Sequence, residues 1–353
     1  MKAITFKNNK TLQIPIIQGG MGVGISRSGL AGAVAREGAM GVISAAQIGY
    51  DQEGFRAQPE ATNLRTLPLE IERAKDTAGG KGLVAVNIMH ATQDYENYVR
   101  TVAEAGADAI ISGAGLPTNL PKAAAGHDIL LAPIVSSAKA AKVILKYWYS
   151  KHHYVADFVV IEGPKAGGHL GFSREDAENA ASVNYDEEIT AIMEVVRDYE
   201  NQAGQAIPVF VAGGILRPED VRHALSLGAS GVQVGTRFVT TYECDADERY
   251  KQAYIDAKEE DVLIVKSPVG MPGRALNNPF IKRVAEGPVP VNGCYNCLSA
   301  CKPAQTPYCI SQALINAVKG DIDNGLIFCG ARVGELDKME SVAEVVRDLN
   351  VEV

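Results

Sequence analysis

The sequence predicts an α/β protein: a (β/α)8 TIM barrel with a small helical, cysteine-rich cap towards its C-terminus. Short apolar runs, rich in β-branched residues and bounded by glycine, occur eight times, and each is followed by a longer stretch with helical periodicity. Runs that are apolar on both faces and alternate with helices are typical of parallel strands joined by right-handed crossovers. Eight such units close a barrel, and an open doubly wound sheet is the alternative.

The expected strands cover residues 13–18, 41–44, 82–87, 108–112, 129–134, 157–161, 208–212 and 231–235. Three of them follow the same junction, in which glycine and alanine come just before the strand, at Gly38-Ala39, Gly106-Ala107 and Gly228-Ala229. Glycine can adopt the left-handed conformation that ends a helix. The repeated junction favours the barrel, although other α/β proteins can use it too.

The pattern changes after Gly235. Residues 245–260, 307–319 and 340–349 are expected to form helices, whereas residues 267–279 are rich in glycine and proline. We therefore expect a barrel at residues 1–245 and a cap at residues 246–353. The last helix is expected to pack back on the barrel.

Composition excludes several classes of function. Of the 353 residues, 46% are hydrophobic, which is enough for a large core. The chain has 34 Lys and Arg against 42 Asp and Glu, and the resulting net charge of −8 disfavours nucleic-acid binding. The chain has no run of about 18 apolar residues and no apolar segment behind its first lysines, so we expect a cytoplasmic protein that does not bind membranes. The sequence does not indicate an oligomeric state.

Two glycine turns predict a phosphate site. Gly213-Gly214 follows the seventh expected strand, and Gly235-Thr236 follows the eighth. A TIM barrel often binds phosphate at the C-terminal ends of these two strands, where backbone N–H groups at helix starts can meet an anion. Neither a dinucleotide-binding glycine motif nor a Walker motif is present, so a mononucleotide such as FMN is the expected cofactor.

One histidine has an unusual setting. His169 follows the sixth strand in Ala166-Gly167-Gly168-His169, and these glycines leave space for a planar ring. Imidazole exchanges protons near neutral pH, so His169 is the candidate acid or base.

These segments resemble a known family. Four motifs match it in order along the chain: Pro15-Ile16-Ile17-Gln18-Gly19-Gly20-Met21, Ala166-Gly167-Gly168-His169, Ala212-Gly213-Gly214-Ile215 and Gln233-Val234-Gly235-Thr236. Over about residues 14–280 the chain resembles the nitronate monooxygenase (2-nitropropane dioxygenase-like) family, which also contains the FMN-dependent enoyl-acyl-carrier-protein reductase.

The resemblance implies an FMN-binding barrel with the flavin across the strand ends and His169 as the catalytic residue. It also implies which residues hold the cofactor: Gly213, Gly214, Gly235 and Thr236 at the phosphate, with Gln233 nearby, and Gly20, Met21, Asn87, Glu162 and Gly167 around the flavin. Two positions depart from the family pattern. Glu162 stands where a Gln often occurs, and Lys165 stands where the family usually has Glu. Lys165 could stabilise negative charge on the flavin or face solvent.

Four of the six cysteines lie in one short stretch, at Cys294, Cys297, Cys301 and Cys309. In a reducing compartment such a cluster favours metal ligation over disulfides. The loop resembles that of iron–sulfur flavoenzymes such as 2,4-dienoyl-CoA reductase, although its fourth cysteine comes sooner. A 4Fe-4S cluster, a structural zinc ion and free thiols are the three alternatives.

The leading hypothesis is an FMN-dependent oxidoreductase that takes electrons from NAD(P)H or a nitronate, with His169 handling a proton. Its substrate would be a small molecule or an acyl compound. Reduction of an enoyl thioester, on the acyl-carrier protein or another carrier, is the first alternative. A sugar-phosphate enzyme on the same barrel is the second, with Lys165 as its only comparable catalytic lysine. A flavin module without catalytic activity would leave His169 without a role.

Overall fold

The computed structural model describes residues 1–180 and 182–352. Eight parallel strands close into a barrel in the order β10-β11-β3-β4-β5-β6-β7-β8. They are β3 (Ile16–Gln18), β4 (Met40–Ser44), β5 (Leu83–Met89), β6 (Ala109–Gly113), β7 (Leu130–Val135), β8 (Val159–Glu162), β10 (Val209–Ala212) and β11 (Gly231–Val234). The predicted barrel and all eight of its strands are confirmed. The first is shorter than expected, because Pro15 has no N–H to donate to a strand ladder.

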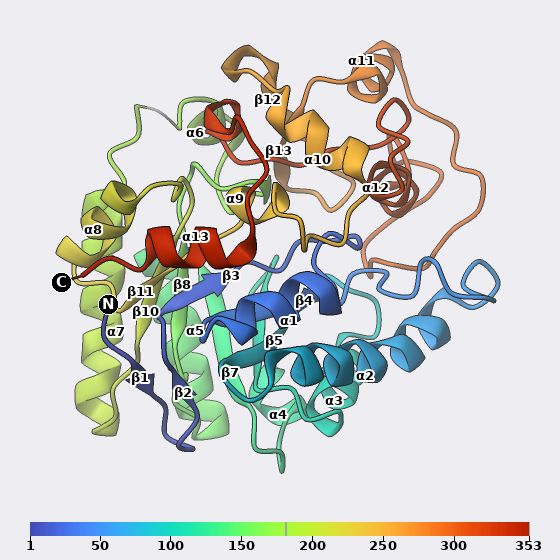
Figure 1. Ribbon diagram of the computed structural model, residues 1–353. Helices are drawn as coiled ribbons and strands as arrows, with labels where there is room; N and C mark the ends of the chain where they lie inside the picture. The colour runs from blue at the N-terminus through green and yellow to red at the C-terminus, as the bar shows by residue number, and fades with distance from the viewer. Residues whose placement is uncertain (181, 353) are drawn as a thin grey trace.

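Helices surround the strands on the outside (Figure 1). They are α1 (Ser28–Arg36), α2 (Pro59–Ala78), α3 (Tyr95–Glu104), α4 (Leu120–Ala123), α5 (Ala138–Tyr147, continued by a π-helical turn at Trp148–His152), α7 (Asp186–Ala203) and α8 (Pro218–Ser226). Only a single turn, α9 (Thr236–Val239), follows the eighth strand. The last helix, α13 (Val342–Leu349), contacts α1, α8 and α9 and so closes the gap in the helical ring.

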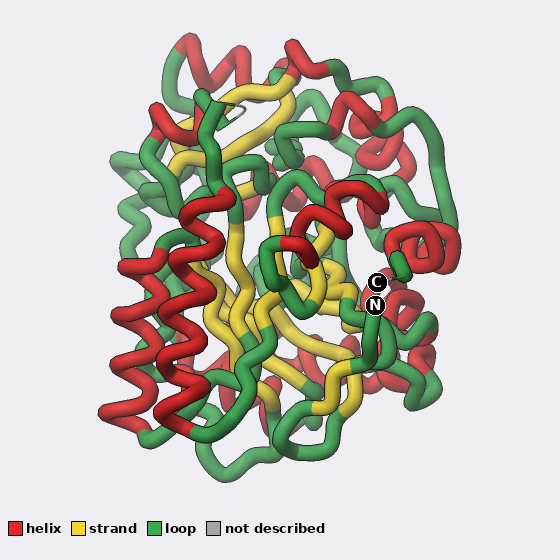
Figure 2. The backbone as a smooth tube through the Cα atoms, turned by 90° about the vertical axis from the view of Figure 1, so that its left-hand side faces the viewer, coloured by secondary structure: helices red, strands yellow, loops and turns green. Residues whose placement is uncertain are grey.

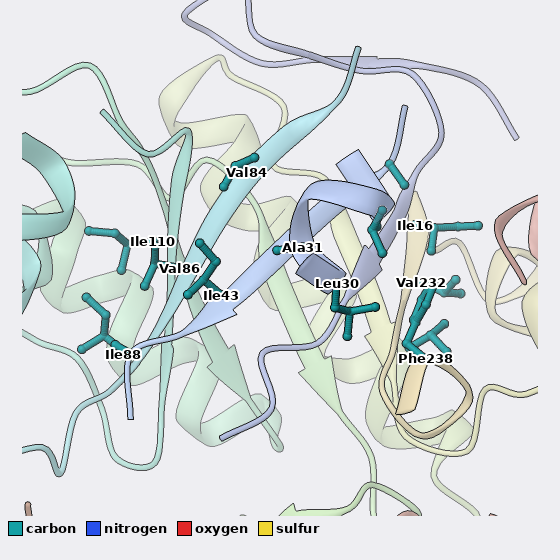
Figure 3. Close-up of a cluster of buried hydrophobic side chains, with 14 of the residues drawn as sticks. Ile16, Leu30, Ala31, Ile43, Val84, Val86, Ile88, Ile110, Val232 and Phe238 are labelled. Carbon is teal, nitrogen blue, oxygen red and sulfur yellow. The ribbon is translucent and has the colours of Figure 1, made fainter. Parts of the chain in front are cut away.

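The hydrophobic core has two layers. Inside the barrel, buried side chains such as Met40, Phe158 and Phe210 fill the lumen, and Phe6 and Leu12 join them from the hairpin of β1 (Ile4–Thr5) and β2 (Thr11–Leu12). A larger layer lies between strands and helices. Figure 3 shows part of it, including Ile43 and Val232 from the strands and Leu30 from α1.

The two termini lie together (Figure 2). The amino group of Met1 donates hydrogen bonds to the side chain of Asn350 and to the carbonyl of Val351. Met1 is therefore held beside the segment that follows α13. Within the described residues, no helix has the length and apolar character needed to cross a membrane.

The cap lies over the C-terminal ends of the barrel strands (Figure 1). It comprises α10 (Glu248–Ile255), a 3-10 turn (Glu259–Asp261), β12 (Val262–Lys266), β13 (Pro272–Leu276), α11 (Pro279–Glu286), α12 (Ile310–Val318) and a 3-10 turn (Val333–Glu335). Three expected helices are present with shorter bounds. The first begins only at Glu248, after the N-cap Asp247. The last begins at Val342, after the N-cap Ser341, whose side chain forms a capping box with Glu344.

The strands β12 and β13 were not predicted from the sequence. β13 pairs with β12 on one side and with β9 (Gly168–His169) on the other, so the cap and the loop after β8 share one antiparallel sheet. Arg274 of β13 is buried and donates hydrogen bonds to the carbonyls of Pro164, Ala166 and Ala177. The loop that carries His169, which continues into α6 (Arg174–Glu178), is thus held by a cap residue.

Arg274→Met should lower the free energy of unfolding by about 3 kcal/mol or more, because three backbone carbonyls lose their charged donor. Urea unfolding measures this, with Arg222→Met, a change at an exposed arginine on α8, as the matched control. Arg274→Lys should lie between Arg274→Met and the parent. If the free energy of unfolding of Arg274→Met lay within about 0.5 kcal/mol of that of the control, Arg274 would not hold the loop in place.

Candidate active site

A cavity of about 270 Å³ opens at the C-terminal ends of the barrel strands and reaches up to the cap. The residues that the sequence analysis assigns to catalysis or to a cofactor all line it: Gly20, Met21, Asn87, Glu162, Gly167, His169, Gly213, Gly214, Gln233, Gly235 and Thr236. They come from five barrel strands and the loops after them. The fold therefore brings together, in one place, residues that span more than two hundred positions of the chain.

One wall of the cavity requires glycine. A Cβ atom on Gly20 would come within 2.4 Å of the Asn87 Cβ, so the chain after β3 can approach β5 only without a side chain. Asn87 is held in turn by a 3.2 Å hydrogen bond from its Nδ2 to the carbonyl of Ile111. The result is a flat backbone surface beside a fixed amide, which suits a planar ring.

The turns after β10 and β11 present free backbone donors. Gly213 and Gly214 have φ values of +97° and +83°, in the left-handed region that favours glycine. In residues 1–180 and 182–352, the N–H groups of Gly214, Gly235 and Thr236 donate to no protein acceptor. The three residues are half-buried and line the cavity, and backbone N–H groups that gather in such turns form a site suited to an anion.

A segment of the C-terminal tail, residues 329–332, closes the same end, and the sequence analysis missed it. A Cβ atom on Gly330 would lie 2.4 Å from the Thr236 Oγ1. Arg332 donates hydrogen bonds to the carbonyl of Gly214 (2.7 Å) and to the Asp220 carboxylate (2.8 Å). This arginine fixes the glycine turn from the outside, and no local sequence signal links two residues so far apart.

His169 lies on the short strand β9 at the cavity wall. Its Nε2 is 2.7 Å from the Oγ of Ser267, a buried serine that also accepts a hydrogen bond from the N–H of Val269. The ring packs edge-on against Phe328, with 5.0 Å between centroids. Desolvation lowers the pKa of His169 to about 4, so the imidazole is neutral at pH 7 and can accept a proton. Ser267 and Phe328 belong to the cap and were not predicted.

Glu162 is another titratable group in the cavity. It ends strand β8, and burial alone raises the pKa of its carboxyl to about 7. None of the lysines, arginines or histidines in the described chain forms a salt bridge with it. Glu162 and His169 therefore titrate in opposite directions from their ordinary values, which is a common property of catalytic sites.

The cap supplies an apolar part of the cavity wall. Its members are Val269, Leu298, Ile310, Leu314 and Phe328. Together with Met89 and Ile134 of the barrel they make this side of the cavity suitable for an alkyl or acyl group.

The four clustered cysteines lie at the rim. Cys297 lines the cavity, whereas Cys294 is exposed and Cys301 and Cys309 are half-buried. In the part of the chain that the structure describes, no group of three or more His, Cys, Asp or Glu side chains is arranged to hold a metal ion. As folded here, the cysteine loop does not fit the predicted metal centre.

Glu162→Gln should stabilise the flavin-free protein at pH 8, by about 1–3 kcal/mol, and have little effect at pH 5. Because the pKa of Glu162 is raised in the folded state, the folded protein holds this proton more tightly than the unfolded chain does. The resulting stabilisation is fully present below the ordinary pKa of 4.5 and is lost as the pH rises through about 7. Urea unfolding at the two pH values tests this, with the exposed Glu104→Gln as control. An equal effect of Glu162→Gln at both pH values would contradict the raised pKa.

Comparison with known proteins gives a consistent result. The family model for nitronate monooxygenase matches residues 5–352. A probable nitronate monooxygenase from Staphylococcus saprophyticus is 28% identical over 298 residues, which are 78% of this chain and 79% of the relative.

Two solved structures share the fold. FabK from Thermotoga maritima has a TM-score of 0.68 at 25% identity, over 96% of this chain and 92% of FabK. The nitroalkane oxidase from Streptomyces ansochromogenes has a TM-score of 0.71 at 20% identity, over 98% of this chain and 95% of that structure. Since the family model covers almost the whole sequence, the chain belongs to the nitronate monooxygenase family of flavin-dependent oxidoreductases.

Proposed function

We propose that the protein is an FMN-dependent oxidoreductase that takes electrons from NAD(P)H or from a nitronate, with His169 handling a proton. One observation carries the proposal: the unpaired N–H groups of Gly214, Gly235 and Thr236 lie in the same cavity as a neutral, desolvated His169. Bound FMN would supply the electron-transfer chemistry.

The residues present fit this cofactor. Gly213, Gly214, Gly235 and Thr236 would hold the phosphate, with Gln233 beside them. Another group would surround the flavin ring: Gly20, Met21, Asn87, Glu162 and Gly167. The close approach of Gly20 to Asn87 supports the assignment, because it leaves a flat surface beside the cavity.

His169 would transfer the proton rather than hold the cofactor. Its lowered pKa keeps it unprotonated at neutral pH, so its free electron pair can accept a proton from a substrate carbon acid. The 2.7 Å contact with Ser267 and the edge-on packing of Phe328 fix the orientation of the ring. These two cap residues position His169.

Reduction of an enoyl thioester is the second candidate, and one observation favours it. The apolar wall formed by Val269, Leu298, Ile310 and Leu314 can accept an acyl chain that is longer than a small nitronate requires. The sugar-phosphate alternative loses its support, because the chain belongs to a family of flavin-dependent oxidoreductases and a sugar has no need of an apolar wall.

His169→Ala should lower turnover by about 10²- to 10⁴-fold while the bound FMN content stays at the parent level. The assay uses NADH and NADPH with a panel of nitronates, enoyl thioesters and quinones, and it is run with and without oxygen. His127→Ala, which changes an exposed histidine, is the control. Unchanged turnover of His169→Ala with every active substrate would exclude the proton-transfer role.

For the cysteine loop we propose that a zinc ion or a 4Fe-4S cluster, when bound, draws Cys294, Cys297, Cys301 and Cys309 together. The support is that the four side chains lie near one another. Burial raises the pKa of the Cys297 thiol to about 11, and the negative charges that Cys309, Cys301 and Cys294 would carry as thiolates add to this effect. A metal would offset this cost of forming thiolates. The geometry described above does not show the centre, so no catalytic step depends on it.

Metal analysis of protein prepared anaerobically should find about one zinc or about four iron atoms per chain. A Cys294→Ser, Cys297→Ser double variant should lose the metal, whereas Cys244→Ser, away from the loop, should retain it. Neither metal at stoichiometric level would reject the site.

A further inference from the structure

Lys165 lies at the end of the cavity where the free backbone donors gather. A Cβ atom on Gly214 would come within 3.1 Å of the Lys165 Cβ and 3.2 Å of its Cδ, so the lysine side chain runs across the glycine turn. The Lys165 carbonyl accepts a 3.1 Å hydrogen bond from the N–H of Ala331. The backbone of Lys165 is thus fixed between the β10 turn and the C-terminal segment 329–332.

The other charges at this end are paired with one another. Arg332 binds Asp220 and Glu335, and Arg217 lies 3.0 Å from Glu335. Asp220 also accepts hydrogen bonds from the N–H groups of Leu216 and Arg217, which cap the start of α8. These contacts neutralise both arginines and both carboxylates. The N–H groups at the start of α8 already bind the Asp220 side chain, so they are not free to bind a ligand.

Lys165 is different, because none of the carboxylates in residues 1–180 and 182–352 lies within 4.0 Å of its Nζ as a salt-bridge partner. It lines the cavity together with Gly214, Gly235 and Thr236. An ammonium group on a flexible stem, beside several unpaired N–H groups, is suited to a phosphate group. A phosphate monoester carries −1.5 to −2 charges at pH 7, and neutral N–H donors alone leave this charge without a counter-ion.

We propose that Lys165 is the counter-ion of the cofactor phosphate, so that this chain binds FMN through a charged side chain as well as through backbone N–H groups. The inference rests on the proposed function. It assigns a specific task to Lys165, which lines the cavity and forms no ion pair within residues 1–180 and 182–352. Lys165 acts in cofactor affinity and not in proton transfer.

A comparison of two flavins isolates the phosphate. The full-length chain, freed of flavin, is titrated with FMN and with riboflavin, which has the same ring but no phosphate, and binding is followed by flavin fluorescence. Lys165→Met should raise the Kd for FMN by roughly 10- to 100-fold and change the Kd for riboflavin less than about twofold. Lys165→Glu should weaken FMN binding further, and Lys165→Arg should restore most of it.

Two controls separate this effect from damage to the fold. Lys81→Met changes an exposed lysine just before β5, at the opposite end of the barrel, and should leave both affinities unchanged. Urea unfolding of each variant should give the parent's stability within about 0.5 kcal/mol. In the parent, FMN affinity should also fall as salt rises, and this dependence should be weaker in Lys165→Met.

The outcomes are distinguishable. If the parent binds FMN but Lys165→Met weakens FMN and riboflavin equally, or weakens neither, then Lys165 does not serve the phosphate and only this inference is overturned. If Lys165→Met changes the flavin reduction potential without a selective loss of FMN affinity, the lysine acts on the ring, which also overturns it. A parent that binds no flavin overturns the proposed function as well.

Discussion

The pairing of the cap strand β13 with the Gly168–His169 strand is the interaction on which the candidate site depends. The loop after β8 is long and glycine-rich, and such a segment has no preferred conformation of its own. The buried guanidinium of Arg274 binds three of its backbone carbonyls, and β13 supplies the ladder that fixes His169. His169, the proposed proton-transferring residue, belongs to the barrel in sequence, but its position is set by the cap.

The same dependence holds at the glycine turns of the cavity. The glycine turns after β10 and β11 provide the donors, whereas Gly330 and Arg332 from the C-terminal tail pack against these turns and fix them. The chain then returns to the barrel as α13, beside α1. Cap and barrel therefore form one structural unit around the cavity, and the C-terminal hundred residues cannot be regarded as an appendage to a complete enzyme.

Sequence patterns predicted the barrel well, because each strand is a continuous apolar run and each glycine turn has a local cause. Those runs predict the eight strands and the site residues at the strand ends, and all of the predicted site residues of the barrel line one cavity.

The cap was predicted less well. β13 begins with Pro272 and Gly273, which are unfavourable in a strand, and it forms only because β12 and β9 pair with it. Ser267, Phe328 and Arg332 act through contacts with distant residues, which no local pattern encodes. Conversely, the cysteine spacing suggested a metal centre that the described geometry does not form.

The central claim is that the unpaired N–H groups after β10 and β11 form the phosphate site of a flavin cofactor. A crystal structure of the full-length protein with FMN tests it most directly. The account predicts phosphate oxygens within about 3 Å of the backbone nitrogens of Gly214, Gly235 and Thr236, and the flavin ring beside Gly20 and Asn87. A phosphate bound elsewhere, with water on these three N–H groups, would contradict it.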